Sequence, residues 1–227
     1  LEQLRPNDFE TLAYHYGQAG DENRARLYYR KAGDRARAVY ANDDAIRFYT
    51  EALTLMPDGE PDQFELLAAR AQVYDLVGRR PEQKADVEAL LALAEKLNDD
   101  VRRLDALLAQ GDYEAAVGIL GADPQAARAV ELARQLNAPA REGRALIQLG
   151  WITRILNNFT QSRDALRNAA EIFKREGLLS EAAESLHTLS LVLSDLNELA
   201  EAQVVVREAL ALSQQAKDKR QEATSLR

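Results

Sequence analysis

The chain has 227 residues, a formal net charge of -8 and no cysteine. The lack of cysteine excludes a disulfide framework and a thiolate metal site, and it fits a reducing cytoplasm, where we expect the protein to reside. An acidic chain is a poor electrostatic match for nucleic acid, so no direct nucleic-acid partner is expected. No apolar run approaches the roughly 18–20 residues of a membrane span and no signal peptide is recognisable, so no membrane association is expected.

Helix-forming residues dominate the composition. Hydrophobic residues make up 46% of the chain, whereas glycine and proline number only 11 and 6. Ala, Leu, Glu, Arg and Gln are abundant, and all of them favour helices. These proportions disfavour a turn-rich β architecture and indicate an all-α fold.

The N-terminal segment predicts a helical hairpin. Pro6-Asn7-Asp8 is a good helix start, and the stripe that follows consists of Phe9, Leu12, Ala13 and Tyr16. Gly20-Asp21 forms a turn, and the partner helix presents Ala25, Tyr29 and Ala32 on its inner face. A glycine turn followed by this small-aromatic-small spacing closely resembles the tetratricopeptide repeat, a helix pair that stacks on copies of itself.

A second copy follows with a less regular length. Ala45, Tyr49 and Ala52 repeat the back-helix pattern, and Pro57 ends it because proline cannot continue a helix. The front helix of this repeat is expected over residues 34–40, which is short for its kind.

The middle of the chain predicts further, less regular helices. Pro57-Asp58-Gly59-Glu60-Pro61 reads as a loop, and Pro61 suits the first turn of the next helix. We expect helices over residues 62–77, 81–97, 114–120 and 124–136, with breaks at Gly78 and Asn98. Gly111-Asp112-Tyr113 is interpreted as a repeat turn, and Gly121-Ala122-Asp123-Pro124 as an insertion.

Two copies of one pattern, 40 residues apart, occupy the C-terminal third. Leu146, Leu149, Leu156 and Ala169 recur as Leu186, Leu189, Leu196 and Ala209. In the first copy one helical stripe consists of Leu146, Leu149, Ile152 and Leu156, and the second of Ala165, Leu166, Ala169, Ala170 and Phe173. Asn157-Asn158 separates them, because Asn tolerates the left-handed backbone that ends a helix. A fixed period of this length in helical sequence is typical of a solenoid.

These patterns together predict a tetratricopeptide-like α-solenoid of antiparallel helix pairs, with about 12 helices in a right-handed superhelix. The expected organisation is a single array over residues 1–227, irregular over 1–138 and regular over 139–227. The sequence lacks an initial Met and Leu226 opens another copy, so we interpret it as a fragment of a longer protein. The helix that begins near Lys219 would then be cut, and the exposed apolar end would permit self-association.

Several segments carry a more specific resemblance. They are Leu12-Ala13-x-His15, Ala19-Gly20-Asp21, Tyr29-Arg30-Lys31-Ala32-Gly33 and Tyr40-Ala41-Asn42-Asp43-Asp44-Ala45. These are similar to the C-terminal helical repeats of bacterial signalling ATPases, including maltose-activator-like regulators and class III nucleotide cyclases. The resemblance implies that the repeats sense or relay a signal, while catalysis lies in other domains.

The sequence carries no constellation typical of catalysis. Neither the phosphate-binding Gly-x-x-x-x-Gly-Lys-Ser/Thr motif nor Gly-x-Gly-x-x-Gly occurs. His15 and His187 are far apart and lack a second His or a Cys at ligand spacing, and Ser190 and Ser194 near His187 lack an oxyanion site. Asp43-Asp44 and Asp99-Asp100 precede helical segments and are interpreted as helix caps. We expect no enzyme activity, no cofactor and no metal ion.

The candidate binding site lies on the concave face, which the first helix of each pair lines in tetratricopeptide arrays. Spacing from Leu149 places Arg144, Gln148, Trp151 and Arg154 on this face in one repeat, and His187, Leu191 and Asp195 in the next. Trp151 is the only Trp in the chain, and Trp and Arg are favoured anchors in interfaces. An acidic or aromatic peptide segment is the expected ligand.

The alternative interpretation is structural. Trp151 then packs between adjacent repeats and the neighbouring arginines are solvated. Arg163, Arg167, Lys174 and Arg175 form a second basic face, on the following helix, which is expected to be solvated.

The sequence therefore predicts a non-catalytic protein-protein interaction or regulatory module of a bacterial signalling or transcription-regulating protein. Its partner would be a protein or peptide segment, in another protein or in the parent chain. One alternative is a sensor of a small-molecule or oligosaccharide effector that uses the same groove. The other is a spacer or oligomerisation scaffold.

Overall fold

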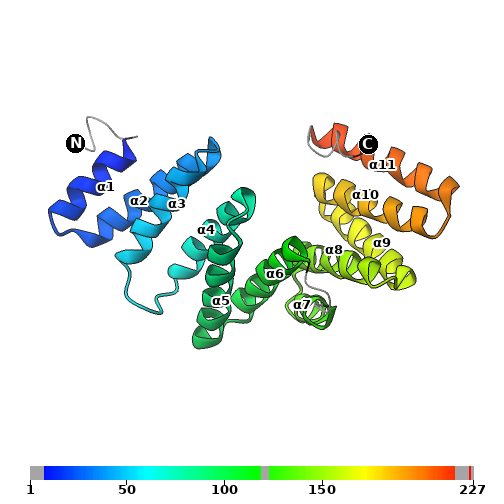
Figure 1. Cartoon of the computed structure of the whole chain (residues 1–227), viewed down its shortest axis with the longest axis horizontal. Coiled ribbons are helices and arrows are strands. Elements are labelled where there is room, and N and C mark those ends of the chain that lie inside the picture. Colours follow the sequence, from blue (N-terminus) through cyan, green and yellow to red (C-terminus); the bar gives the residue numbers. More distant parts are fainter. Residues whose placement is uncertain (1–7, 119–122, 218–224, 226–227) are drawn as a thin grey trace. The chain divides into compact units, whose positions relative to one another are not determined.

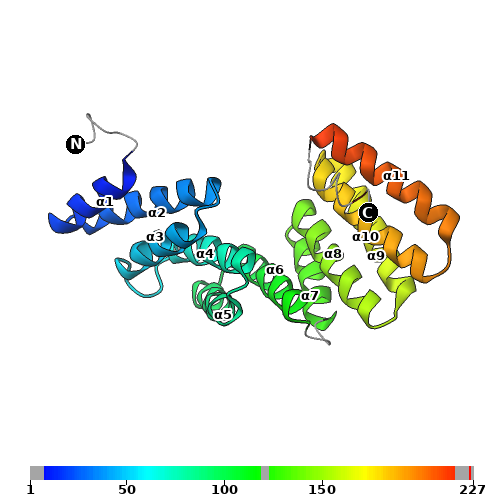
Figure 2. The same ribbon diagram turned by 45° about the horizontal axis from the view of Figure 1, so that its top comes forward.

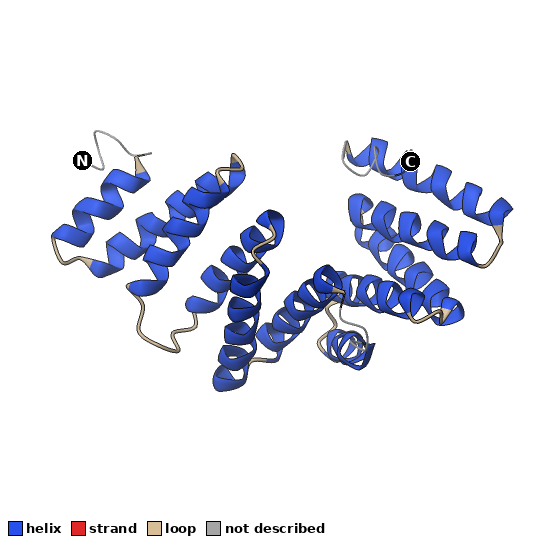
Figure 3. Cartoon of the chain, in the orientation of Figure 1, coloured by secondary structure: helices blue, strands red, loops and turns tan. Residues whose placement is uncertain are grey.

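The computed structural model describes residues 8–118, 123–217 and 225. These residues fold into α-helices joined by short turns, and no strand occurs among them (Figure 3). Their helices are α1 (Phe9–Gln18), α2 (Glu22–Ala38), α3 (Asn42–Thr54), α4 (Gln63–Val77), α5 (Arg80–Leu97), α6 (Asp100–Val117), α7 (Asp123–Gln135), α8 (Pro139–Ile155), α9 (Phe159–Glu176), α10 (Leu179–Asp195) and α11 (Leu199–Ala216). The expected all-α fold is confirmed.

Two compact units divide the chain, Leu1–Tyr113 and Glu114–Arg227, and the division falls within α6. Inside each unit the helices pack mainly on their neighbours in the sequence, as a solenoid requires (Figure 1). The single continuous array over residues 1–227 stays a prediction. The two units are described separately below.

The core of the first unit is centred on Tyr49 in α3, which is fully buried. Its ring lies against α2 at Gly33, where an added Cβ would stand only 2.7 Å from a ring carbon. The Tyr49 hydroxyl donates a hydrogen bond of 2.8 Å to the Asp34 carboxylate. Burial, reinforced by that carboxylate, raises the pKa of Tyr49 well above its usual range. Tyr49, which the sequence pattern placed on the inner face of its helix, is therefore a core residue whose hydroxyl has a hydrogen-bond partner.

The short front helix expected over residues 34–40 is wrong. Helix α2 continues without a break to Ala38, so the second repeat shares this helix with the first. Gly33 causes no turn, because it is helical and provides the space that the Tyr49 ring fills. The turn comes at Tyr40, whose φ of 60° is left-handed. Glycine inside a helix costs only about 1 kcal/mol relative to Ala, so packing overrides it easily.

The expected turn at Gly111-Asp112-Tyr113 is also wrong, because glycine does not end the helix there. Helix α6 runs through Gly111, which is buried within it. The helix stops before Gly118, whose φ of 69° supplies the left-handed ending. Residues 119–122 lie outside the described residues, and with them the end of the helix expected over 114–120 and the first half of the expected insertion, whereas Asp123 and Pro124 begin α7.

Asparagine and glycine end most of the other helices, as their sequence positions predict. Asn98, Asn157 and Gly78 all have positive φ, and Asn137 and Asn197 do as well. The expected helices 62–77, 81–97 and 124–136 agree with α4, α5 and α7 to within one residue at each end. Pro61, however, lies before the N-cap Asp62 and not in the first turn of α4.

The second unit contains the regular copies. Helices α8, α9, α10 and α11 pack side by side in that order (Figures 1 and 2). Leu149 and its repeat equivalent Leu189 are both buried, at 8% and 2% exposure. Gly150 lets α8 approach α9 closely, since a Cβ there would stand 2.5 Å from Leu166 Cγ. The helix stripes that the period predicts are confirmed except at Leu156, which follows the last turn of α8 and is 42% exposed.

Lys219 and Leu226, on which the additional helix and the open end were predicted, lie outside the described residues. Among the described helices, none combines the length and the apolar character that crossing a membrane would require.

Candidate functional site

The candidate site lies where the last turns of α8 and α10 meet in the second unit. Arg154 of α8 donates a hydrogen bond from Nε to Asp195 Oδ2 of α10, with a distance of 2.7 Å. Both side chains are partly exposed, at 25% and 34%. The structure thus brings together two residues that the sequence placed on one face in adjacent repeats.

Trp151 lies one turn before Arg154 on the same helix. The Arg154 guanidinium carbon lies 5.6 Å from the centre of the indole ring, which is cation-π distance. Trp151 is 37% exposed, so the ring is not enclosed between the repeats. Arg154 therefore contacts both the indole ring and the Asp195 carboxylate, and Trp151 remains 37% exposed to solvent.

Ile155 extends the apolar surface and was missed in the sequence interpretation. It follows Trp151 by four residues, so the two side chains lie on one face of α8, and Ile155 is 46% exposed. Leu156, beside it, is 42% exposed. The i, i+4 spacing from Trp151 was the signal that could have identified Ile155. The exposed Trp151 and Ile155 side chains and the Arg154–Asp195 ion pair define a surface called here the Trp151 face: Trp151, Arg154, Ile155 and Asp195.

The remaining residues of the predicted site differ in their exposure to solvent. Arg144 is exposed on α8, about two turns before Trp151. Gln148 is only 8% exposed, so its side chain belongs to the packed interior and offers little surface to a ligand. Leu191 and His187 on α10 are half-buried.

His187 has an unusual environment for a polar side chain. Its Nδ1 atom is buried and has no hydrogen-bond partner within the described residues. Burial lowers the pKa of His187 because the charged imidazolium is desolvated there. The neighbouring hydroxyls bond to their own helix: Ser190 donates to the His187 carbonyl at 2.6 Å, and Ser194 to the Ser190 carbonyl at 2.9 Å. These three residues therefore show no nucleophile-base arrangement.

The Arg154–Asp195 ion pair makes the site less positive than the sequence predicted. Arg154 is compensated by Asp195, so it is not a free cation for an acidic ligand. Its position near the C-terminal end of α8 is favourable for a positive charge. The Trp151 face consequently offers aromatic and aliphatic surface with a locally neutral charge pair beside it.

The second basic face is partly ion-paired: Arg175 is 68% exposed, as a solvated face predicts, but the other three side chains have acidic partners on a neighbouring element. Arg163, Arg167 and Lys174 of α9 each form an ion pair with α11, to Glu198, Glu201 and Glu208 respectively. The Lys174 Nζ to Glu208 distance is 2.5 Å, and the Arg163 to Glu198 distance is 3.6 Å. Such partly exposed pairs contribute only about 0–1 kcal/mol each to stability. They nevertheless compensate the positive charges that an acidic ligand would otherwise bind.

The aspartate pairs have structural partners. Asp99 caps α6, because its carboxylate accepts hydrogen bonds of 3.0 Å from the backbone N–H groups of Val101 and Arg102. The hydrogen bond from Arg102 N–H is the main cause of the lowered pKa of Asp99. The other pair does not cap: Asp43 and Asp44 lie in the first turn of α3 and form ion pairs with Arg79 and Arg47. No cluster of three potential metal ligands occurs among the described residues.

Comparisons with known proteins identify the fold. No family model and no curated protein sequence matches the chain. The structure of a Rap protein complexed with Competence and Sporulation Factor is similar with a TM-score of 0.76 and 17% identity, covering 88% of this chain and 57% of that one. The chain thus spans little more than half the length of that relative.

Two further structures have the same helical repeats. One is a signal transduction ATPase with numerous domains and a tetratricopeptide repeat sensor from Pyrococcus horikoshii, with a TM-score of 0.70, 16% identity and coverage of 99% of this chain and 36% of that one. The other is NprR in complex with its cognate peptide NprX, with a TM-score of 0.64, 13% identity and coverage of 98% and 66%. The resemblance to tetratricopeptide repeats is confirmed, and the chain has the fold of such an array.

Proposed function

We propose that the chain is a non-catalytic interaction module that binds a protein or peptide segment on the Trp151 face. The observation that carries the proposal is the placement of Arg154 between the Trp151 ring and the Asp195 carboxylate. An indole held in one orientation loses little freedom when a ligand binds, and fixed aromatic residues are the commonest interface anchors.

The chemistry of the face favours a partner with an apolar or aromatic anchor. Trp151 and Ile155 provide the contact surface, while the charge of Arg154 is already balanced. An acidic residue in the partner would have to compete with Asp195, so acidity alone gives little affinity. We therefore propose a segment whose large apolar side chain lies against the indole.

The fold supports this class of function. Rap was solved with Competence and Sporulation Factor and NprR with its cognate peptide, so arrays of similar fold bind peptide or protein partners. The repeat sensor of the Pyrococcus horikoshii ATPase supports a regulatory role within a larger signalling protein. We propose this context, in a bacterial cytoplasm, for the present chain, with a partner in the same or another protein.

A peptide-selection experiment tests the proposal. A phage-displayed library of random peptides is selected on the wild-type chain, and the dissociation constants of enriched synthetic peptides are measured for three proteins. These are the wild type, Trp151→Ala and Val204→Ala. Val204 is the matched control, because it is an exposed apolar residue of the same unit (61% exposed) but lies on α11.

The proposal predicts that Trp151→Ala weakens binding at least about tenfold, which corresponds to ~1.4 kcal/mol, while Val204→Ala has no effect. Selection that yields no saturable binder, or peptides that bind Trp151→Ala as tightly as the wild type, would contradict it. Equal weakening by both variants would show a loss of stability rather than of a contact. Matching melting temperatures are therefore required of all three proteins.

A further inference from the structure

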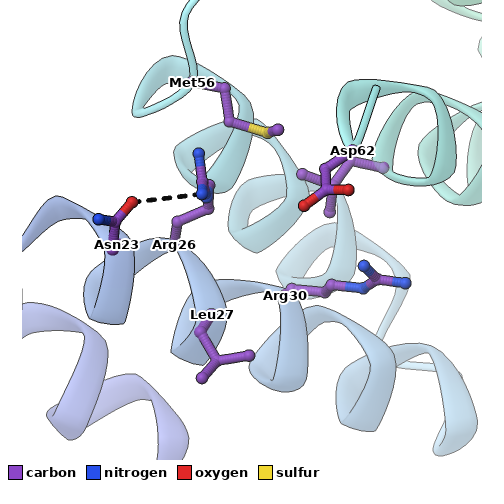
Figure 4. Close-up of a pocket in the computed structure, with 7 residues that line it drawn as sticks. Asn23, Arg26, Leu27, Arg30, Met56 and Asp62 are labelled. Atoms are coloured by element: carbon purple, nitrogen blue, oxygen red, sulfur yellow. Dashed lines mark hydrogen bonds between the residues drawn. The ribbon is translucent and has the colours of Figure 1, made fainter. Parts of the chain in front are cut away.

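A small hollow lies in the first unit, far in sequence from the Trp151 face. Helix α2 forms one wall with Asn23, Arg26, Leu27 and Arg30, and the segment between α3 and α4 forms another with Met56 and Asp62 (Figure 4). Its volume is about 130 Å³. That is room for about four water molecules and is less than the ~300 Å³ at which pockets for drug-sized ligands begin. Any ligand of this hollow must be small.

One arginine of the hollow is already compensated. Arg26 forms an ion pair of 3.0 Å with Glu60, and its guanidinium also donates to the Asn23 side-chain oxygen at 3.3 Å. Figure 4 shows the second contact as a dashed line. Arg26 thus helps to build the wall and has little capacity left for a ligand.

Two other charged side chains of the hollow have no ion-pair partner among the described residues. Arg30 has neither a hydrogen bond nor an ion pair with any residue in the part of the chain that the structure describes, and the same holds for Asp62. Asp62 occupies the N-cap position of α4 but makes no side-chain capping bond. Opposite charges line one hollow without neutralising each other, so a ligand carrying both charges can satisfy them together.

Between these charges the surface is apolar. Leu27 is 47% exposed although it is a large aliphatic residue, and it lines the hollow together with buried Met56 and Leu66. A ligand that covers Leu27 gains hydrophobic stabilisation in proportion to the area removed from water. The hollow of about 130 Å³ is therefore lined by a cationic group, an anionic group and an aliphatic surface.

We propose that this hollow binds a free aliphatic α-amino acid, represented by leucine. The α-carboxylate would pair with Arg30, the α-ammonium with Asp62, and the side chain would lie on Leu27 and Met56. A simple carboxylic acid or amine would leave one of the two charges uncompensated, and an internal peptide residue has neither terminal charge. The site is independent of the Trp151 face, so either proposal can fail without the other.

The chain offers a direct reporter for this test. Met56 is the only Met in the sequence, so selective 13C labelling of the methionine methyl group gives one NMR signal, from the lining of the hollow. The protein is titrated with L-leucine, with N-acetyl-L-leucine, which lacks the ammonium, and with L-leucinamide, which lacks the carboxylate. Glycine tests the contribution of the side chain.

The proposal predicts a saturable shift of the Met56 signal with L-leucine and affinities at least about tenfold weaker for the two blocked analogues and for glycine. Arg30→Gln and Asp62→Asn should each remove the response to L-leucine. Arg128→Gln is the matched control, because it removes an exposed arginine from α7 in the other unit and should change nothing.

Three outcomes would overturn the assignment. They are the absence of a saturable shift with L-leucine, an equal response to the blocked analogues, and an unchanged response in both charge variants. Because Arg30 and Asp62 are exposed, both variants should keep the wild-type melting temperature, so loss of the response cannot be attributed to unfolding.

Discussion

Arg154 and Asp195 are 41 residues apart in the sequence, yet their side chains meet at 2.7 Å and join two successive repeats. The same guanidinium lies against the only Trp of the chain. This arrangement links the repeat period to the proposed site: the 40-residue repeat brings the ends of equivalent helices together, and Arg154 there contacts both Asp195 and the exposed indole.

The strength of this link is testable with a double-mutant cycle. Arg154→Gln, Asp195→Asn and the double variant are compared by urea unfolding. Since both side chains are about a quarter to a third exposed, solvent screening limits the coupling to about 0.5 kcal/mol. The tryptophan emission of Asp195→Asn should also change, because Arg154 is released. A coupling energy of zero together with an unchanged spectrum would show that the pair does not position Trp151.

The repeated leucines should tolerate no charge. Leu189 is 2% exposed between α10 and its neighbours, so Leu189→Asp should cost about 3–5 kcal/mol of unfolding free energy. Leu149→Asp should behave similarly. The control is Leu199→Asp, since Leu199 is 56% exposed in the first turn of α11, where an acidic residue is favourable. Equal unfolding midpoints for Leu189→Asp and the wild type would contradict the core assignment.

Two glycines should respond in opposite directions to the same substitution. Gly150→Ala places a Cβ at 2.5 Å from Leu166 Cγ and should destabilise the second unit by about 1–3 kcal/mol. In α1, Gly17→Ala meets only Ala25 Cβ at 3.9 Å, an ordinary contact, and should stabilise by up to about 1 kcal/mol. Thermal unfolding of both variants measures the contrast. The packing account fails if Gly150→Ala is the more stable of the two.

The half-buried His187 predicts a pH dependence of stability. Because burial lowers the pKa of His187 below its ordinary value near 6.5, the unfolded chain binds the proton more readily than the folded chain. The contribution of His187 is complete above pH ~6.5 and is lost as the pH falls through the lowered pKa. The stability of the wild type should therefore decrease more than that of His187→Gln between pH ~7.5 and ~5. Parallel losses in both proteins would exclude His187 as the cause.

The sequence predicted the architecture well where local and repeat signals agree. Asn157 ends α8 and Asn197 ends α10, since both sit at one fixed place in a strict period and tolerate a left-handed backbone. Gly111 was misinterpreted as a turn, because glycine occurs both in turns and inside packed helices. Only the tertiary contact, such as the Tyr49 ring on Gly33, distinguishes the two roles.

The site was predicted less completely than the fold. Spacing along α8 and α10 placed Trp151, Arg154 and Asp195 on one face, because repeat registration is readable in the sequence. Residue spacing could not show that Arg154 forms an ion pair with Asp195, or that Gln148 is buried. Both depend on the distance between the neighbouring helices. The ion pairs between α9 and α11 could not be predicted either, because the sequence does not show whether a charged side chain on a helix surface is solvated or has a partner on another helix.

If the Trp151 ring itself contacts the partner, the tryptophan fluorescence of the chain must change on binding. Trp151 is the only Trp, so a wild-type chain titrated with a selected peptide that lacks Trp reports on this ring alone. We expect a saturable blue shift of the emission as the 37% exposed indole is covered, with the same dissociation constant as calorimetry gives. An emission spectrum that stays unchanged at saturating peptide would contradict it.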